Sequence, residues 1–313
     1  MNKRIVNNTF SLYLRQIFIV VITLYSVRVL LNELGVEGFG IYSVVAGFVS
    51  LLAFLPGSMA SATQRFFSFA MGQNNNENLK KTFSANLIMY TVISLFAYLL
   101  LKTIGQWYVE GYLKIPEGRY ASALELYNYT SIAFIVSIFT SPFIAIITAH
   151  EDMHLYAFLS VVDAVLKLGL TISLVFVDYD LLIYYGKGIC VISTLITVIY
   201  FIICVRRYSE CQFRVFYWDS RMLKEILAFT SWTLFGQIST VFRNQATTIL
   251  VNQTFSPTIV AARVVALSVA SQILVFSNNL NTGLYPPIIK SYAANEKDEM
   301  MALVFNGSKL TFF

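Results

Sequence analysis

The chain has 313 residues, of which 57% are hydrophobic and only 12% are charged. An ordinary soluble domain carries about a quarter charged residues, so this composition excludes a soluble globular protein. The net charge of +5 would suit nucleic-acid binding in a soluble protein, but in a chain this apolar it indicates basic residues gathered on one side of a membrane. We therefore expect membrane lipids, and no nucleic acid, as partners.

Eight apolar runs are each long enough to cross a bilayer as a helix of about 20 residues. In chain order they cover 10–32, 39–63, 83–105, 123–148, 155–177, 181–205, 226–251 and 257–280, and a ninth run begins near Met301. Pro56-Gly57 and Pro142 are expected to kink the second and fourth spans, and Pro286-Pro287 to end the eighth. The predicted fold class is an all-α polytopic membrane protein.

Basic residues predict the orientation of these spans. With the N terminus in the cytoplasm, the cytoplasmic segments would carry eleven Lys and Arg residues, and the opposite side would carry three: Lys102, Lys114 and Arg119. Cytoplasmic loops are enriched in Lys and Arg. We therefore expect a multi-pass protein of a cytoplasmic membrane with its N terminus inside.

Cysteine and histidine indicate no metal centre or cofactor. The three cysteines form no CxxC pair, and we interpret them as packing thiols. His150 and His154 flank two acidic residues; a metal site is one interpretation, and a polar loop between two spans is the favoured one. Because no GxxxxGK[ST] loop occurs, we expect no ATP hydrolysis. No cofactor is expected, and a proton or sodium gradient is a candidate driving force.

Two pairs of segments resemble each other at similar spacing. Thr9–Ile17 resembles Thr230–Ile238 at an offset of 221, and Ser68–Asn74 resembles Ser291–Lys297 at an offset of 223. An even number of spans separates the copies, so they form a parallel repeat. The predicted domains are an N-terminal six-helix lobe, 1–220, and the start of a C-terminal lobe, 221–313, with two full spans and the beginning of a third.

Two polar turns carry a family resemblance. Leu34–Ser43 resembles the first external turn of polysaccharide flippases, and so does the later stretch Ser61–Gly72 that leads into Asn78–Lys81. The chain thereby resembles the multidrug/oligosaccharidyl-lipid/polysaccharide (MOP) exporter superfamily, and within it the Wzx-type flippases of O-antigen and other polysaccharide repeat units. The resemblance implies a MOP/MATE-like two-lobe helical bundle around a central cavity. The family usually has twelve to fourteen spans, so we expect a bundle truncated in its second lobe.

Ionisable residues within spans are costly and usually face a cavity or a partner. Eight occur here: Arg15, Arg28, Arg65, Asp163, Lys167, Lys187, Arg243 and Arg263. Arg15 and Arg65 lie near cytoplasmic ends, where we expect them to snorkel to headgroups. Asp163 and Lys167 share one helical face and form either a structural pair or a gating or coupling pair. The predicted substrate-binding residues are Arg28, Gln237, Arg243, Asn244, Gln245 and Arg263, with an interfacial position as the alternative for Arg28.

The predicted function is that of a flippase and not of an enzyme. It would move an undecaprenyl-diphosphate-linked oligosaccharide, an O-antigen or capsular repeat unit, across the bacterial inner membrane by alternating access. Guanidinium groups would bind the diphosphate, and polysaccharide polymerase machinery is an expected partner. One alternative is a multidrug exporter of the same superfamily, which would favour cavity carboxylates. A second is a membrane-embedded polymerase or glycosyltransferase, which would need a larger external loop. A third is a structural membrane protein.

Overall fold

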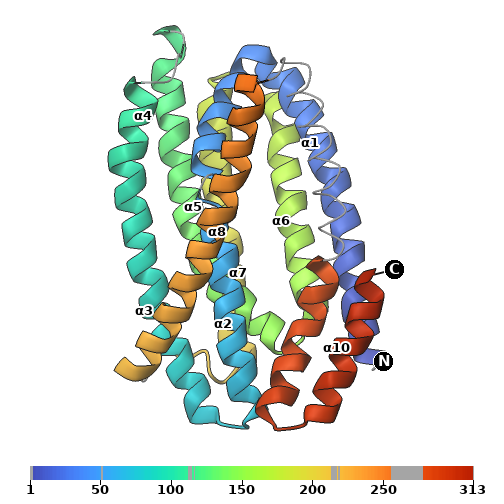
Figure 1. Cartoon of the computed structure of the whole chain (residues 1–313). Helices are drawn as coiled ribbons and strands as arrows, with labels where there is room; N and C mark the ends of the chain where they lie inside the picture. Colours follow the sequence, from blue (N-terminus) through green and yellow to red (C-terminus); the bar gives the residue numbers. More distant parts are fainter. Residues whose placement is uncertain are drawn as a thin grey trace.

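The computed structural model describes residues 3–50, 52–111, 115, 117–212, 217, 219–254 and 278–312. Within these ranges the chain is helical and has no strand. The helices are α1 (Lys3–Ser50), α2 (Phe54–Gly72), α3 (Asn76–Leu100), α4 (Gln106–Gly111), α5 (Tyr120–Ala149), α6 (Met153–Ser173), α7 (Leu181–Arg207), α8 (Ser220–Thr254), a helix over 278–293 and α10 (Lys297–Phe312). Three short elements, η1 (Leu101–Gly105), η2 (Glu117–Arg119) and η3 (Leu174–Phe176), complete the described order. The long helices stand side by side (Figure 1).

Six stretches of the described residues are long and apolar enough to cross a membrane. They are Asn7–Gly35, Glu37–Gly72, Asn76–Gly111, Tyr120–Ala149, Met153–Phe176 and Leu181–Arg207. The prediction of an all-α polytopic fold is thereby confirmed, although the helices are longer than the predicted spans. The seventh predicted span lies within α8, and most of the eighth lies outside the described residues.

The prolines differ in their effects. The second span is interrupted between Ser50 and Phe54, shortly before Pro56. The eighth span does not end at Pro286-Pro287, because the helix over 278–293 continues through both. α5 likewise continues through Pro142. Membrane helices tolerate proline because neighbouring groups satisfy the freed carbonyls. Pro56 is the third residue of α2, in the first turn, where the missing N–H has no helical acceptor anyway.

A glycine separates the first two spans. Gly35 has φ 69° and ψ 174° inside α1, a conformation that side chains disfavour. The chain therefore reverses there, at the turn that the sequence predicts, and α1 contributes two neighbouring helical segments to the bundle.

α5 lies at the centre of the bundle. In its most apolar window 67% of residues are buried, against 6% to 28% in the other five spans. α7, α2 and α3 pack against it. Small residues allow this approach; at Gly186 of α7, for example, an added Cβ would lie 3.1 Å from Leu126 Cδ1 of α5. The surrounding helices leave apolar faces outward, as contact with lipid requires.

Two turns at one end of the molecule have the same hydrogen-bonding pattern. We call this the lower end, after its place in Figure 1; it also carries the N terminus. After α2, the amides of residues 73, 74 and 75 donate to the carbonyls of 69, 71 and 70, and after the helix over 278–293 the amides of 294, 295 and 296 donate to those of 290, 292 and 291. Asn74 and Asn295 both have positive φ, 51° and 65°.

Every member of this pattern is displaced by 221 residues. That spacing equals the offset between Thr9–Ile17 and Thr230–Ile238. It differs by two residues from the offset of the second sequence match, so pairing Ser68 with Ser291 is out of register; the backbone pattern pairs Ser68 with Ile289. The division into lobes at residue 220 stays a prediction.

Candidate functional site

A cavity of about 630 Å³ lies inside the bundle of the first six spans. Its walls come from α1, α5, α6 and α7, with Pro56 of α2. Because α6 packs closely against α1 but more sparsely against α5, a space remains between α6 and α5. Apolar residues form part of the wall, including Ile19, Ile22, Leu30 and Ile196.

Hydroxyl groups dominate the remaining wall. Twelve of the 24 lining residues carry one: Thr23, Ser26, Tyr42, Ser137, Thr140, Ser141, Tyr156, Ser160, Thr171, Tyr185, Ser193 and Tyr200. Some have internal partners; Thr140 and Thr197 Oγ1 atoms lie 2.6 Å apart. Five serine and threonine hydroxyls of the wall donate to carbonyls of their own helix, and their oxygens can still accept hydrogen bonds from a ligand. The wall can therefore bind a polar ligand without carrying much charge.

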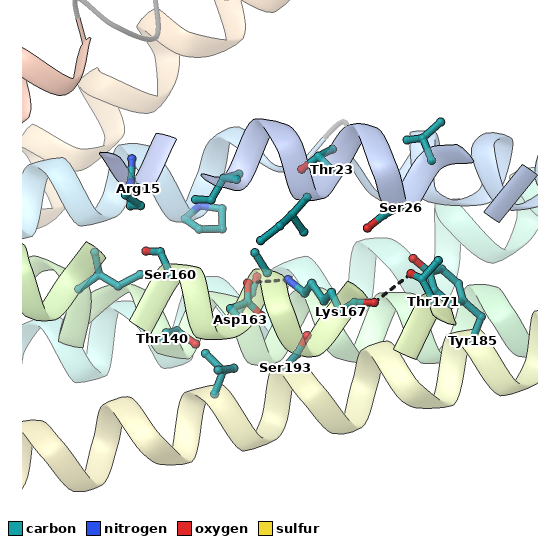
Figure 2. A pocket seen from close by; sticks show the side chains of 18 of the residues that line it. Arg15, Thr23, Ser26, Thr140, Ser160, Asp163, Lys167, Thr171, Tyr185 and Ser193 are labelled. Atoms are coloured by element: carbon teal, nitrogen blue, oxygen red, sulfur yellow. Dashed lines mark hydrogen bonds and ion pairs between the residues drawn. The ribbon is translucent and has the colours of Figure 1, made fainter. Parts of the chain in front are cut away.

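Three charged residues face this cavity. Lys167 Nζ lies 2.8 Å from Asp163 Oδ2, one helical turn away on α6, and the side chains are 44% and 29% exposed. Figure 2 shows this pair midway along the row of lining residues, with Arg15 at one end and Thr171 and Tyr185 at the other. The charges sum to one net positive charge.

None of the predicted substrate-binding residues whose side chains the structure describes lines this cavity. Arg28 on α1 and Gln237 and Arg243 on α8 are exposed. Asn244 and Gln245 lie on α8, and Arg263 lies outside the described residues. Their substrate role stays a prediction.

A periodic stripe on α6 is the signal that the sequence interpretation missed. Tyr156, Ser160, Asp163, Lys167 and Thr171 recur every three or four residues and all line the cavity. This spacing places polar groups on one helical face, and such a face in an apolar span indicates an internal cavity. Singling out charged residues alone left the hydroxyls of the same stripe unnoticed.

Arg15 also differs from its predicted role. Instead of snorkelling to headgroups, it is half-buried and lines the cavity. Its Nη2 donates to Asn279 Oδ1 at 3.1 Å, and its guanidinium carbon lies 4.7 Å from the centre of the Tyr156 ring. It therefore joins α1 to α6 and to the helix over 278–293.

Below Arg15, the helix over 278–293 stays close to the first six spans. A Cβ on Gly283 would lie 3.2 Å from Thr9 Oγ1 of α1. A Cβ on Gly72 would lie 2.5 Å from the Lys290 carbonyl oxygen. Lys290 Nζ also binds Glu151 Oε1 at 2.6 Å. The lower end is therefore closed by close helix packing and one ion pair.

The turn between α5 and α6 holds Glu151 in place. Glu151 has φ 62°, and its side chain is 9% exposed. On one side of it, His150 Nε2 lies 2.5 Å from Glu210 Oε1, and the His150 ring stacks on Tyr208. On the other side, the Tyr208 hydroxyl donates to Asp152 at 2.6 Å; burial raises the pKa of this phenol, so it keeps its proton.

The histidines of this turn have separate partners. His154 Nδ1 lies 2.6 Å from Ser11 Oγ, away from the contact of His150 with Glu210. In the part of the chain that the structure describes, no three His, Cys, Asp or Glu side chains are grouped as metal ligands would be. The geometry supports the polar-loop interpretation of these residues.

Comparison with known proteins adds family and fold. The family model described as "Polysaccharide biosynthesis protein" matches residues 5–291, whereas no curated protein matches significantly. Among solved structures, the chain is similar to an outward-facing multidrug resistance MATE family transporter of the MOP superfamily, with 14% identity, a TM-score of 0.80, and coverage of 98% of this chain and 68% of that chain.

Two further solved structures agree. MATE in complex with MaD3S has 14% identity and a TM-score of 0.84, over 98% of this chain and 70% of that one. A MOP superfamily transporter from Pyrococcus furiosus, described as having a binding pocket of reverse polarity, has 13% identity and a TM-score of 0.83, over 98% and 68%. At these identities the likeness establishes the fold.

The family match covers most of the chain, and the structural likeness extends over nearly all of it. Together they confirm the resemblance stated from the sequence, because the family model matches by sequence and the solved MOP-superfamily transporters match by fold. The chain belongs to the polysaccharide biosynthesis protein family and has the MATE-like fold of MOP-superfamily transporters.

Proposed function

We propose that this protein moves an undecaprenyl-diphosphate-linked oligosaccharide, such as an O-antigen or capsular repeat unit, across a bacterial cytoplasmic membrane by alternating access. The observation that carries this proposal is the hydroxyl-rich cavity in a chain of the polysaccharide biosynthesis family. The polyprenyl tail would stay in lipid while the polar headgroup crosses through the protein.

The cavity wall suits a glycan. Sugars present many hydroxyls, which pair with the serine and threonine hydroxyls that line the cavity. Tyr42 and Tyr185 pack edge to face with ring centres 5.2 Å apart, and such rings offer flat apolar surfaces to a sugar ring. Ligand pockets of about 300–1,000 Å³ are typical of small-molecule sites, so 630 Å³ can hold a few sugar rings.

The charge of the wall separates this proposal from multidrug export. A cationic drug needs an unpaired carboxylate, but the acid that lines the cavity, Asp163, is bound to Lys167. With Arg15 nearby, the net charge of the lining is positive. A positive, hydroxyl-rich wall favours an anionic or neutral polar ligand. The proposed diphosphate contacts stay Arg28, Gln237, Arg243, Asn244, Gln245 and Arg263, none of which belongs to the described lining of the cavity.

The Asp163–Lys167 pair is our proposed gating or coupling pair. Its two charges cancel while they are 2.8 Å apart, and a ligand or proton that binds one of them leaves the other unpaired. A charge unpaired at this depth is costly. Entry of a ligand or ion would therefore change the stability of the surrounding helices.

We propose that the lower end faces the cytoplasm. α3 begins there with Lys80 and Lys81, and α7 ends there with Arg206 and Arg207, whereas the upper end carries Lys102 and Arg119. The excess of positive charge is the cytoplasmic signal. The flipped headgroup would then reach the polymerase machinery on the outer face.

The test is headgroup translocation in proteoliposomes, together with growth of a flippase-deletion strain. The wild-type chain should expose a lipid-linked oligosaccharide to an added glycan-modifying reagent, whereas Arg243→Ala should block this exposure and still insert into the membrane. Arg221→Ala, an exposed arginine at the start of α8, is the matched control and should behave as wild type. Full activity of Arg243→Ala would remove that residue from the site, and export of a lipophilic cation without glycan movement would favour the multidrug alternative.

A further inference from the structure

Arg15 lies where the cavity meets the contact between the two repeats. It lines the cavity, and its hydrogen bond to Asn279 connects residues 264 positions apart. Leu12, one turn below, is fully buried beside Gly283 of the same partner helix. The side chain is therefore in contact with the cavity and with the closed lower end at once.

The partner of Arg15 is weak for a guanidinium. It binds a neutral amide oxygen, and no carboxylate in the described part of the chain lies within ion-pair distance. Hydrogen bonds between guanidinium and an anionic oxygen are roughly twice as strong as neutral ones, and they are frequently bidentate. An anion that enters the cavity therefore competes favourably for this side chain.

Two donors of this contact lack acceptors. Arg15 Nε and Asn279 Nδ2 are buried and have no hydrogen-bond partner within the described ranges. Asn279 is only 5% exposed. Buried donors left unpaired are costly, so the polar contact between Arg15 and Asn279 stabilises the closed arrangement only weakly.

We propose that Arg15 links the cavity to the closure of the lower end. A phosphate-class anion in the cavity binds the Arg15 guanidinium and draws it away from Asn279. The helix over 278–293 then loses its polar contact with α1, and the lower end opens. This inference rests on the proposed function for the nature of its ligand, and it assigns to Arg15 a positioning role between ligand and gate.

The experiment measures the lower end directly. Spin labels on Asn76 and Lys297, the exposed first residues of α3 and α10, report the distance across it in the cysteine-free full chain in lipid nanodiscs. Inorganic pyrophosphate is the probe, and sodium chloride of equal ionic strength is the reference. We expect pyrophosphate to add a population with a longer distance.

Two variants separate the steps. Arg15→Gln keeps a donor for Asn279 but lacks the charge, so the lower end should stay closed and the pyrophosphate concentration needed for opening should rise roughly tenfold or more. Asn279→Ala should raise the open population without any anion. Arg206→Gln removes an exposed arginine of the same end and should leave both measurements unchanged.

Opening of Arg15→Gln at the wild-type pyrophosphate concentration would overturn the proposal, as would a wild-type chain that ignores pyrophosphate. An unchanged distance distribution for Asn279→Ala would contradict it too. If Arg15→Gln is not recovered folded, Arg15→Lys and Asn279→Ala test the proposal instead. Lysine keeps the charge but not the guanidinium fork, so Arg15→Lys should open at a higher pyrophosphate concentration than the wild type. If pyrophosphate opens the wild-type chain in an Arg15-dependent way but the chain moves no lipid-linked oligosaccharide, only the proposed function is refuted. If the Arg15→Gln variant moves the oligosaccharide at the wild-type rate, only this inference is refuted.

Discussion

The turn after α2 and the turn before α10 have the same pattern of backbone hydrogen bonds, but the residues at which the two copies touch differ in size. Residues 72 and 293 are equivalent at the spacing of 221, and a Cβ on Gly72 would lie 2.7 Å from the Cβ of Ala293. Two copies of a surface related by a two-fold axis bring equivalent residues together at that axis. One copy lacks a side chain at this point, and the close approach of the lower end depends on that difference.

The largest effect is expected for Gly72→Ala. The new Cβ would meet the Lys290 carbonyl oxygen and the Ala293 Cβ, both attached to helical backbone, and overpacking of this kind costs about 1–3 kcal/mol. The lower end should lose its closed population in the spin-label experiment, and translocation should fall. Gly57→Ala is the control on the same helix, since a Cβ there meets nothing within 4 Å.

Moving the glycine to the other copy sharpens this comparison. Gly72→Ala combined with Ala293→Gly removes the contact between the two Cβ atoms but leaves the one with the Lys290 carbonyl. We expect partial recovery of the closed population. If the double variant is as open as Gly72→Ala, the meeting of equivalent residues is not what limits closure.

A smaller effect is expected from the ion pair beside this contact. Glu151→Lys places two ammonium groups where one pair lay at 2.6 Å, so the closed state should lose about 2 kcal/mol. Glu151→Lys with Lys290→Glu should restore part of the closed population. Glu225→Lys breaks the exposed pair with Arg221 and should change little; an equal loss there would show that overall charge, and not this contact, matters.

The smallest effect concerns the caps of the two turns. The Asn75 side chain accepts a hydrogen bond from the Asn78 amide at the start of α3, and loss of such a cap costs about 1 kcal/mol. Asn75→Ala should therefore lower the thermal unfolding midpoint in detergent by more than Glu296→Ala, the equivalent change before α10. Equal shifts would mean that the backbone pattern alone stabilises both turns.

Hydropathy and turn residues made most of the fold predictable. The first six spans follow from apolar length, and Gly35 marks the first reversal because its φ is positive. Helix ends were predicted less well. Proline usually ends an isolated helix because it lacks an N–H donor, whereas the helix over 278–293 continues through Pro286-Pro287. The candidate site was predicted only in the Asp163–Lys167 pair, because i,i+4 spacing alone brings those side chains together.

The sequence by itself determined the membrane class, the number of early spans and the family resemblance, because each depends on composition, apolar length or local motif. Only the tertiary structure decided what Arg15 contacts. Position along a span predicts depth in the bilayer but not direction around the helix relative to its neighbours. The packing of α1 against α6 and the helix over 278–293 turned a residue expected at the headgroups into one that joins the cavity to the lower end.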